Sequence, residues 1–347
     1  MCVNTGRIVH LNTPPYLVRF PVSKTMAALS KKDQLRRFKV ENLQGLSERK
    51  HGGKGSFGAV YEVTVDGVPR IAKRLHDILL TPDIHTSETE RIRERFYGEC
   101  YLLSKLNHPN IVGFVGVYFE EVNYADVALI MESLHTDLQH FFDPDEHPHI
   151  PVSIKLSILL DVSAGLLYLH TQLEPLIHRD LKPENVLLTM DVRAKIADLG
   201  VSKLLTNYPH RGTIQTKCPG SLAYMPPEAL CEDPKYDTCL DIFPFGQLAL
   251  YTAVQQFPQV FDVINHPKMT SAHRIGELEI LRRKKWIDKL PQDHCLRKVI
   301  LQCLKDKALE RQTTQQLNRE MKILCVKNPK LLDDVILVWG DKTKVYS

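Results

Sequence analysis

The chain has few cysteines, and their spacing does not suit metal or redox chemistry. Eight stand among 347 residues, and no two form a Cys-x-x-Cys pair. Structural zinc sites and thiol oxidoreductases use that spacing, and small disulfide scaffolds carry cysteine at a much higher density. We therefore exclude these classes and expect reduced thiols in a cytoplasmic protein.

The sequence also lacks a strong charge imbalance and a long apolar run. Lys and Arg total 45 against 41 Asp and Glu, and the net charge of +4 is too small to indicate a nucleic-acid partner. The longest apolar stretches, Ile111–Phe119 and Ile154–Leu169, are short or interrupted by polar residues, so we expect no transmembrane segment. The first residues predict neither a signal peptide nor myristoylation.

The residue patterns divide the chain into a strand-rich first third and a helix-rich remainder. β-Branched residues fill 59–65, and Asp66-Gly67 then favours a type I′ turn into a return strand at Val68–Ala72. Two more strands are expected at 111–119 and 125–131. Helices are expected at Met26–Phe38, Arg91–Leu106, Ile154–Leu169, Asp241–Val254, Gln292–Lys305 and Gln312–Val326.

Two charged residues stand in apolar surroundings. Glu99 lies on the apolar stripe of the helix expected at 91–106, between Phe96 and Leu103, and Lys73 ends the apolar return strand. Because an unpaired buried charge is costly, we expect the two to form an ion pair, in which the lysine can also hold phosphate oxygens.

Three polar segments carry residues suited to phosphate and metal chemistry. Gly53-Lys54-Gly55-Ser56-Phe57-Gly58 is a glycine-rich turn whose backbone N–H groups can approach phosphate, and a strand follows it where a dinucleotide fingerprint needs a helix. In Ile177–Leu188, Asp180 and Asn185 can present oxygens to a hydroxyl proton and a hard cation, and Lys182 adds positive charge. Asp198 supplies a second carboxylate after another short strand.

Together these segments resemble a eukaryotic protein kinase catalytic domain over roughly residues 45–325. His178-Arg179-Asp180-Leu181-Lys182-Pro183-Glu184-Asn185 matches the catalytic loop of that family residue for residue. The resemblance implies an α+β, bilobal protein kinase fold, with a β-rich N-lobe that holds one helix and a helical C-lobe. It also implies ATP and Mg²⁺ as cofactors, Asp180 as the catalytic base, Asn185 and Asp198 as metal ligands, and Lys73 as a phosphate contact.

The same resemblance implies a nucleotide site and domain limits. The kinase domain would span 45–327, with the N-lobe up to 131, a hinge at 132–134 and the C-lobe at 135–327, between an N-terminal extension (1–44) and a C-terminal tail (328–347). The residues implied to bind the nucleotide are Gly53, Lys54, Gly55, Ser56, Phe57, Gly58, Val60, Ala72, Lys73, Glu99, Met131, Glu132, Leu134 and Leu187.

Further positions match the family, and a few depart from it. Asp241 lies where the family anchors its catalytic loop, and Arg311 where it pairs with the glutamate at 228. Leu103, Phe114, His178 and Leu199 fall where the family stacks a spine of apolar side chains. The departures are Gly52 before the glycine-rich turn, Leu199 for the usual Phe, Pro227 for the usual Ala, and Pro244, which we expect in the first turn of its helix or at a distortion.

The substrate class follows from smaller features. Lys182-Pro183-Glu184 and Ser221 are similar to Ser/Thr kinases, and the segment around Tyr224-Met225 resembles the tyrosine-kinase-like branch, whose members mostly phosphorylate Ser and Thr. We therefore expect a Ser/Thr-specific protein kinase of intracellular signalling that acts on protein substrates. Tyrosine or dual specificity, and a pseudokinase scaffold without phosphoryl transfer, stay open as alternatives.

Regulation is expected in the segment after Asp198. Arg179 beside the catalytic base resembles kinases whose activation loop is ordered by a phosphate, and Lys203 supplies a second cation. Thr213 and Thr216 are the expected acceptors. An upstream kinase, or autophosphorylation in trans, would supply the phosphate.

Overall fold

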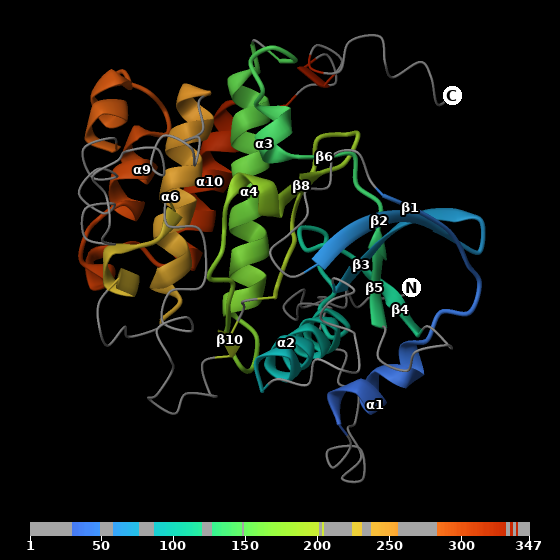
Figure 1. Ribbon diagram of the computed structural model, residues 1–347. Coiled ribbons are helices and arrows are strands. Elements are labelled where there is room, and N and C mark those ends of the chain that lie inside the picture. Colours follow the sequence, from blue (N-terminus) through green and yellow to red (C-terminus); the bar gives the residue numbers. More distant parts are fainter. Residues whose placement is uncertain are drawn as a thin grey trace, which may run out of the picture.

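A five-stranded antiparallel sheet forms the first part of the fold, with strand order β1-β2-β3-β5-β4 (Figure 1). Its strands are β1 (Leu43–Glu48), β2 (Gly58–Val65), β3 (Val68–Leu75), β4 (Phe114–Phe119) and β5 (Val127–Glu132). The computed structural model describes residues 30–48, 58–75, 87–119, 127–147, 149–200, 203–204, 224–230, 237–255, 283–330, 334–335 and 338.

The β2–β3 hairpin has the turn that its sequence predicts. Asp66 and Gly67 have φ angles of 51° and 77°, and a type I′ turn requires positive φ at both central residues. Val65 and Val68 pair on either side of the turn. The two turn residues therefore set the register of β2 and β3. Lys73 lies near the end of β3.

One long helix, α2 (Ser87–Leu103), shares its apolar core with the sheet. The short α1 (Lys31–Leu35) and η2 (Arg36–Phe38) precede β1. The prediction of a helix at 91–106 was correct in place but three residues too long at its end. Strand β4 begins at Phe114 because the preceding residues have other partners: Ile111 bridges to Ile196, and Val112 N donates to Ile196 O at 2.9 Å.

Helix α4 (Val152–His170) is the centre of the helical part and contacts α6 (Cys239–Val254) and α10 (Thr314–Lys327) (Figure 1). Among the described helices it is the one that is long and apolar enough to cross a membrane, but most of it is buried inside the fold. Its apolar sequence thus serves as the core. Helix α9 (Arg297–Cys303) packs on α6 and is shorter than the predicted 292–305, since turns occupy 291–296.

Pro244 is the sixth residue of α6, so of the two predicted places, the first turn or a distortion, the first does not apply. Leu240 N and Asp241 N begin the helix by donating to carbonyls three residues earlier, and the helix then continues through the proline to Val254. Phe243 and Phe245 on either side are fully buried. Their burial offsets the hydrogen bond that proline cannot donate.

Short elements complete the fold. These are β6 (Thr136–Asp137), α3 (Leu138–Phe141), β7 (Leu176–Ile177), η4 (Pro183–Asn185), β8 (Val186–Leu188), β9 (Ala194–Ile196), β10 (Lys203–Leu204), η6 (Pro227–Leu230) and η7 (Ala308–Glu310). In the β8–β9 hairpin Val186 pairs with Ile196. Because pairing aligns the ends of the strands, Asn185 and Asp198 emerge on the same side of the hairpin.

Candidate active site

Lys73 joins three elements through one ammonium group. Its Nζ lies 2.7 Å from Glu99 Oε1 on α2 and 2.9 Å from Asp198 Oδ1, which follows β9. Burial lowers the pKa of Lys73, but the two carboxylates outweigh it and raise this pKa above its ordinary value. Burial in turn raises the pKa of Glu99. The ion pair predicted between Lys73 and Glu99 is confirmed, and Asp198 is its third member.

Asp198 is open to a further ligand. Its Oδ1 accepts hydrogen bonds from Lys73 and from Gly200 N, and 47% of its side chain is exposed. Burial raises the pKa of Asp198, but the charge and hydrogen bond of Lys73 lower it more, so the carboxylate is ionised. The backbone at Asp198 has a φ of 58°, a left-handed conformation that a non-glycine residue keeps only where its surroundings impose it.

The residues predicted to be catalytic lie together in η4 and the loop before it. Asn185 Nδ2 donates to the backbone oxygen of Asp180 at 2.7 Å and to its Oδ2 at 3.1 Å. Lys182 Nζ lies 3.4 Å from the same Oδ2. Ala197 N donates to Asn185 O at 2.9 Å, which ties this loop to the residue before Asp198. The contacts therefore gather Asp180, Lys182, Asn185 and Asp198 into one site.

His178 connects the two halves of this site. Its Nε2 lies 2.9 Å from the carbonyl oxygen of Ala197 and donates to it, so Nδ1 is left to accept the N–H of Asp180 at 3.3 Å. The ring is fully buried. A single imidazole thus fixes the distance between the loop that carries Asp180 and the strand end that carries Asp198.

Asp241, in the first turn of α6, anchors the loop that carries Asp180. Its Oδ2 accepts the N–H of His178 at 2.8 Å, and its Oδ1 accepts the N–H of Arg179 at 2.9 Å. His170 Nε2 also lies 2.7 Å from Oδ2. Burial raises the pKa of Asp241, but these hydrogen bonds and His170 lower it overall. The anchor allows Arg179 to keep a φ of 72°.

The sequence matches the model of the protein kinase domain over residues 46–321. The chain belongs to this family. Its relatives include the serine/threonine-protein kinase VIK of Arabidopsis thaliana, 32% identical over 228 residues, which cover 65% of this chain and 48% of VIK. A cysteine-rich receptor-like protein kinase of the same plant, number 26, is 35% identical over 57% of this chain and 28% of its own length.

A probable serine/threonine-protein kinase of Dictyostelium discoideum is 32% identical over 59% of this chain and 32% of its own length. The chain therefore spans about half the length of VIK, and a smaller share of the other two.

The side chains predicted to enclose a nucleotide base lie on strands β2, β3, β5 and β8 and in the loop after β5. Ala72 on β3 is fully buried, Leu134 is nearly so, and Val60, Met131 and Leu187 are half-buried. Glu132 was assigned to the hinge, but its carboxylate is used in contacts with other parts of the fold. Its Oε1 accepts the N–H of Gly113 at 2.6 Å and lies 2.8 Å from Lys195 Nζ on β9. Its side chain connects the sheet to β9.

Two other predictions from the family resemblance can be compared with the structure. Arg311 donates to Glu228 from both terminal nitrogens, Nη1 and Nη2, at 2.5 and 2.7 Å, as predicted. Leu103, His178 and Leu199 are buried in the core, and Phe114 packs against it, so the predicted spine positions are internal. Leu199 is 3% exposed. Leucine therefore fills the place of the usual phenylalanine.

Several predicted residues lie outside the described part of the chain. They are Gly53, Lys54, Gly55, Ser56, Phe57, Thr213, Thr216 and Ser221, together with Gly52. Gly58 begins β2, and the backbone of Lys203 forms β10 with β7. The phosphate contact of the glycine-rich turn and the expected phosphate acceptors, Thr213 and Thr216, thus stay predictions.

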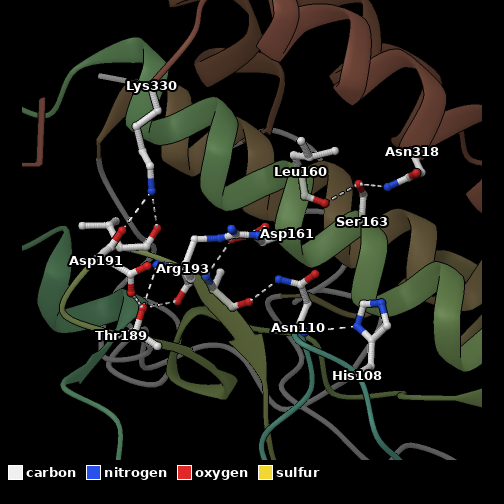
Figure 2. Close-up of polar contacts among 12 residues, drawn as sticks. His108, Asn110, Leu160, Asp161, Ser163, Thr189, Asp191, Arg193, Asn318 and Lys330 are labelled. Atoms are coloured by element: carbon white, nitrogen blue, oxygen red, sulfur yellow. Dashed lines mark hydrogen bonds and ion pairs between the residues drawn. The ribbon is translucent and has the colours of Figure 1, made fainter. Parts of the chain in front are cut away.

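Sequence reasoning missed a second network, which holds the β8–β9 hairpin (Figure 2). Asp161 on α4 binds Arg193 through two bonds of 2.8 and 2.7 Å and accepts Ala194 N. Asn110 Nδ2 donates to Ala194 O, and Lys330 Nζ donates to Asp191 O at 2.9 Å. The signal was present, because a carboxylate inside the apolar helix at 154–169 needs a partner.

Proposed function

We propose that this protein is a Mg²⁺- and ATP-dependent protein kinase that transfers the γ-phosphoryl group to serine and threonine hydroxyls of protein substrates. The observation that carries this proposal is the single ammonium group of Lys73 held between Glu99 and Asp198, beside the loop of Asp180 and Asn185. A cation positioned by two carboxylates on different elements suits the oxygens of a nucleotide phosphate.

The oxygen donors of the site fit magnesium. Asp198 offers a half-exposed carboxylate, and Asn185 offers its Oδ1, since Nδ2 is used on Asp180. Within the described ranges no three His, Cys, Asp or Glu side chains gather as a cage for a metal. Magnesium does not need one, because it is usually held by one or two carboxylates together with substrate phosphates. When bound, the ion neutralises charge on the phosphate oxygens.

The base, the added positive charge and the positioning of the loop are supplied by residues of the chain. Asp180 accepts the proton of the attacking hydroxyl, and Lys182, 3.4 Å from its carboxylate, adds positive charge where negative charge develops. Asp241 and His178 hold the loop so that the base and the metal ligand Asp198 keep a fixed separation. Such fixed positions lower the barrier without any movement at the moment of reaction.

The preference for serine and threonine rests on sequence. Lys182-Pro183-Glu184 is similar to Ser/Thr kinases, and the names of two relatives contain the words serine/threonine-protein kinase. A pseudokinase is the competing function. Against it, the five polar residues needed for transfer are present: Lys73, Glu99, Asp180, Asn185 and Asp198.

The test is transfer of labelled phosphate from ATP by the full chain, with Mg²⁺, to peptide libraries containing a single Ser, Thr or Tyr acceptor. Asp180→Asn should lower kcat about 10²- to 10⁴-fold, because the base is lost. Asp145→Asn, an exposed carboxylate in a turn, is the matched control and should keep full activity.

Label on tyrosine peptides alone would refute the Ser/Thr assignment. ATP binding without transfer by the parent chain would refute the kinase and favour a scaffold. Equal rates for the parent and Asp180→Asn would refute the assigned base.

A further inference from the structure

Residues 30–40 form a segment that the protein kinase domain model, which begins at residue 46, does not include. Ser30 caps α1 by accepting the N–H of Asp33 at 3.1 Å, and α1 leads directly into η2. The segment carries one fully buried side chain, Leu35. It is therefore an ordered addition to the family fold, close to α2 in Figure 1.

One end of this segment packs on α2. Helix α1 contacts α2 directly, and Lys32 Nζ lies 5.8 Å from the centre of the Tyr97 ring. Leu35 and Tyr97 are both buried in the main apolar core. Lys31 comes so near that a Cβ on Gly98 would lie 3.3 Å from its Nζ. Glu99, the partner of Lys73, directly follows Gly98 in α2.

The other end packs on the edge of the sheet. Val40 N donates to Val117 O at 2.9 Å, and Lys39 forms a parallel bridge to Val117. Gly116 makes this approach possible, because a Cβ there would lie 2.7 Å from Phe38 O and 2.4 Å from Val40 Cγ2. Since β4 is the last strand in the sheet order, the segment also covers an unpaired edge.

Helix α2 packs in the apolar core through Phe96, Cys100 and Leu103. The ion pair to Lys73 also connects it to β3, and segment 30–40 connects it to β4. The contact through segment 30–40 is thus an additional restraint on rotation of the helix. The apolar anchor at Leu35 is the part of this restraint that is wholly removed from water.

We propose that Leu35 is a positioning residue for catalysis: through α2 it holds Glu99 where it orders Lys73. The inference rests on the proposed kinase function. Leu35 touches neither substrate nor reacting atoms, and it acts only through the Lys73–Glu99 pair. Release of the segment would leave the chemistry of the site intact but lower the fraction of molecules in which Lys73 is correctly placed.

The experiment compares Leu35→Ala with Leu317→Ala in the full chain. Leu317 on α10 is as fully buried as Leu35, but α10 packs mainly on α4, so Leu317 controls for the loss of a buried leucine. Leu35→Ala should lower kcat about 10- to 100-fold with little change in the KM for the peptide. Leu317→Ala should lower the melting temperature but keep kcat, and Leu35→Met should restore activity by restoring volume.

Two further measurements separate positioning from general damage. In a double-mutant cycle, Leu35→Ala should cause no further loss of activity in a Glu99→Gln background. Leu35 acts only through the Lys73–Glu99 ion pair, which Glu99→Gln already removes. Hydrogen exchange should become faster in α2 but not in α10. Should Leu35→Ala fold poorly, Gly116→Val displaces residues 38–40 from β4 and should give the same exchange pattern.

Additive costs in the cycle, or uniformly faster exchange across the molecule, would overturn the positioning role. Exchange does not depend on catalysis. A parent chain without transferase activity would therefore refute the proposed function, whereas selective loosening of α2 would still show that the segment holds this helix.

Discussion

Lys155 offers a direct test of the energetic reasoning, because its charge is buried in the first turn of α4. The residue is 8% exposed, and in the part of the chain that the structure describes its ammonium has no hydrogen-bond or ion-pair partner. Burial is the cause that lowers its pKa from 10.5 to about 8. The amino end of a helix adds to the penalty, since it disfavours cations.

The size of the penalty follows from that pKa. A tenfold change in an acidity constant corresponds to about 1.4 kcal/mol, so the protonated ammonium costs the folded state up to about 3 kcal/mol near neutral pH. Lys155→Met keeps an unbranched chain of similar length and removes the charge. Because water still reaches part of the ammonium group, the gain should be smaller than this upper bound, and the variant should be more stable than the parent at pH 7 by about 1–2 kcal/mol.

The sign of the pH dependence is fixed by the same values. Between pH 8 and 10.5 the unfolded chain binds more protons at this residue than the folded chain does, so the stability of the parent relative to Lys155→Met should rise with pH in that window. Urea unfolding of both proteins at pH 7 and at pH 10 measures the difference. Burial lowers the pKa of His294, and the positive charge of Lys155 lowers it further, so NMR titration should show a higher pKa for His294 in the variant.

A variant less stable than the parent at pH 7, with the same pH dependence, would refute this account. It would mean that the ammonium makes a favourable contact at α4. An unchanged pKa for His294 would likewise show that the two side chains do not interact.

Three further outcomes are expected from urea unfolding. Asp241→Asn should destabilise the fold by about 3–5 kcal/mol, because a donor replaces an acceptor facing buried N–H groups. Since the pKa of Asp241 is lowered in the fold, its contribution is present above the unfolded pKa and is lost as pH falls through the folded one, and the variant should lack this part of the acid dependence. Arg311→Lys should cost about 2 kcal/mol, since lysine cannot reproduce the two-bond contact with Glu228. Gly246→Ala should cost about 1–3 kcal/mol despite its better helix propensity, because the new Cβ would lie 2.5 Å from Cys303 Cβ, and a neutral result would show that α6 and α9 separate easily.

Much of the site was predictable because its residues are contiguous or obey a local rule. The loop from His178 to Asn185 is one segment, and the Asp66-Gly67 turn needs only residues that accept positive φ. The pairing of Lys73 with Glu99 followed from two charges without local partners. The contacts of Asp161 with Arg193 and of Glu132 with Lys195 were not predicted, since their members are 32 and 63 positions apart. The apolar helix around Asp161 signalled that this carboxylate needs a partner, but nothing local identified Arg193 as that partner.

The sequence by itself determined the chemistry of this protein: which acids, amides and ammonium groups are available, and which strands and helices carry them. Local propensity and apolar periodicity suffice for that, because they act within a few residues. Only the tertiary structure decided that Asp198 completes the Lys73–Glu99 pair, that one imidazole spans Asp180 and Ala197, and that a segment before the kinase domain packs against α2. Those arrangements depend on how separate elements bury their apolar faces together, and burial is a property of the assembled chain.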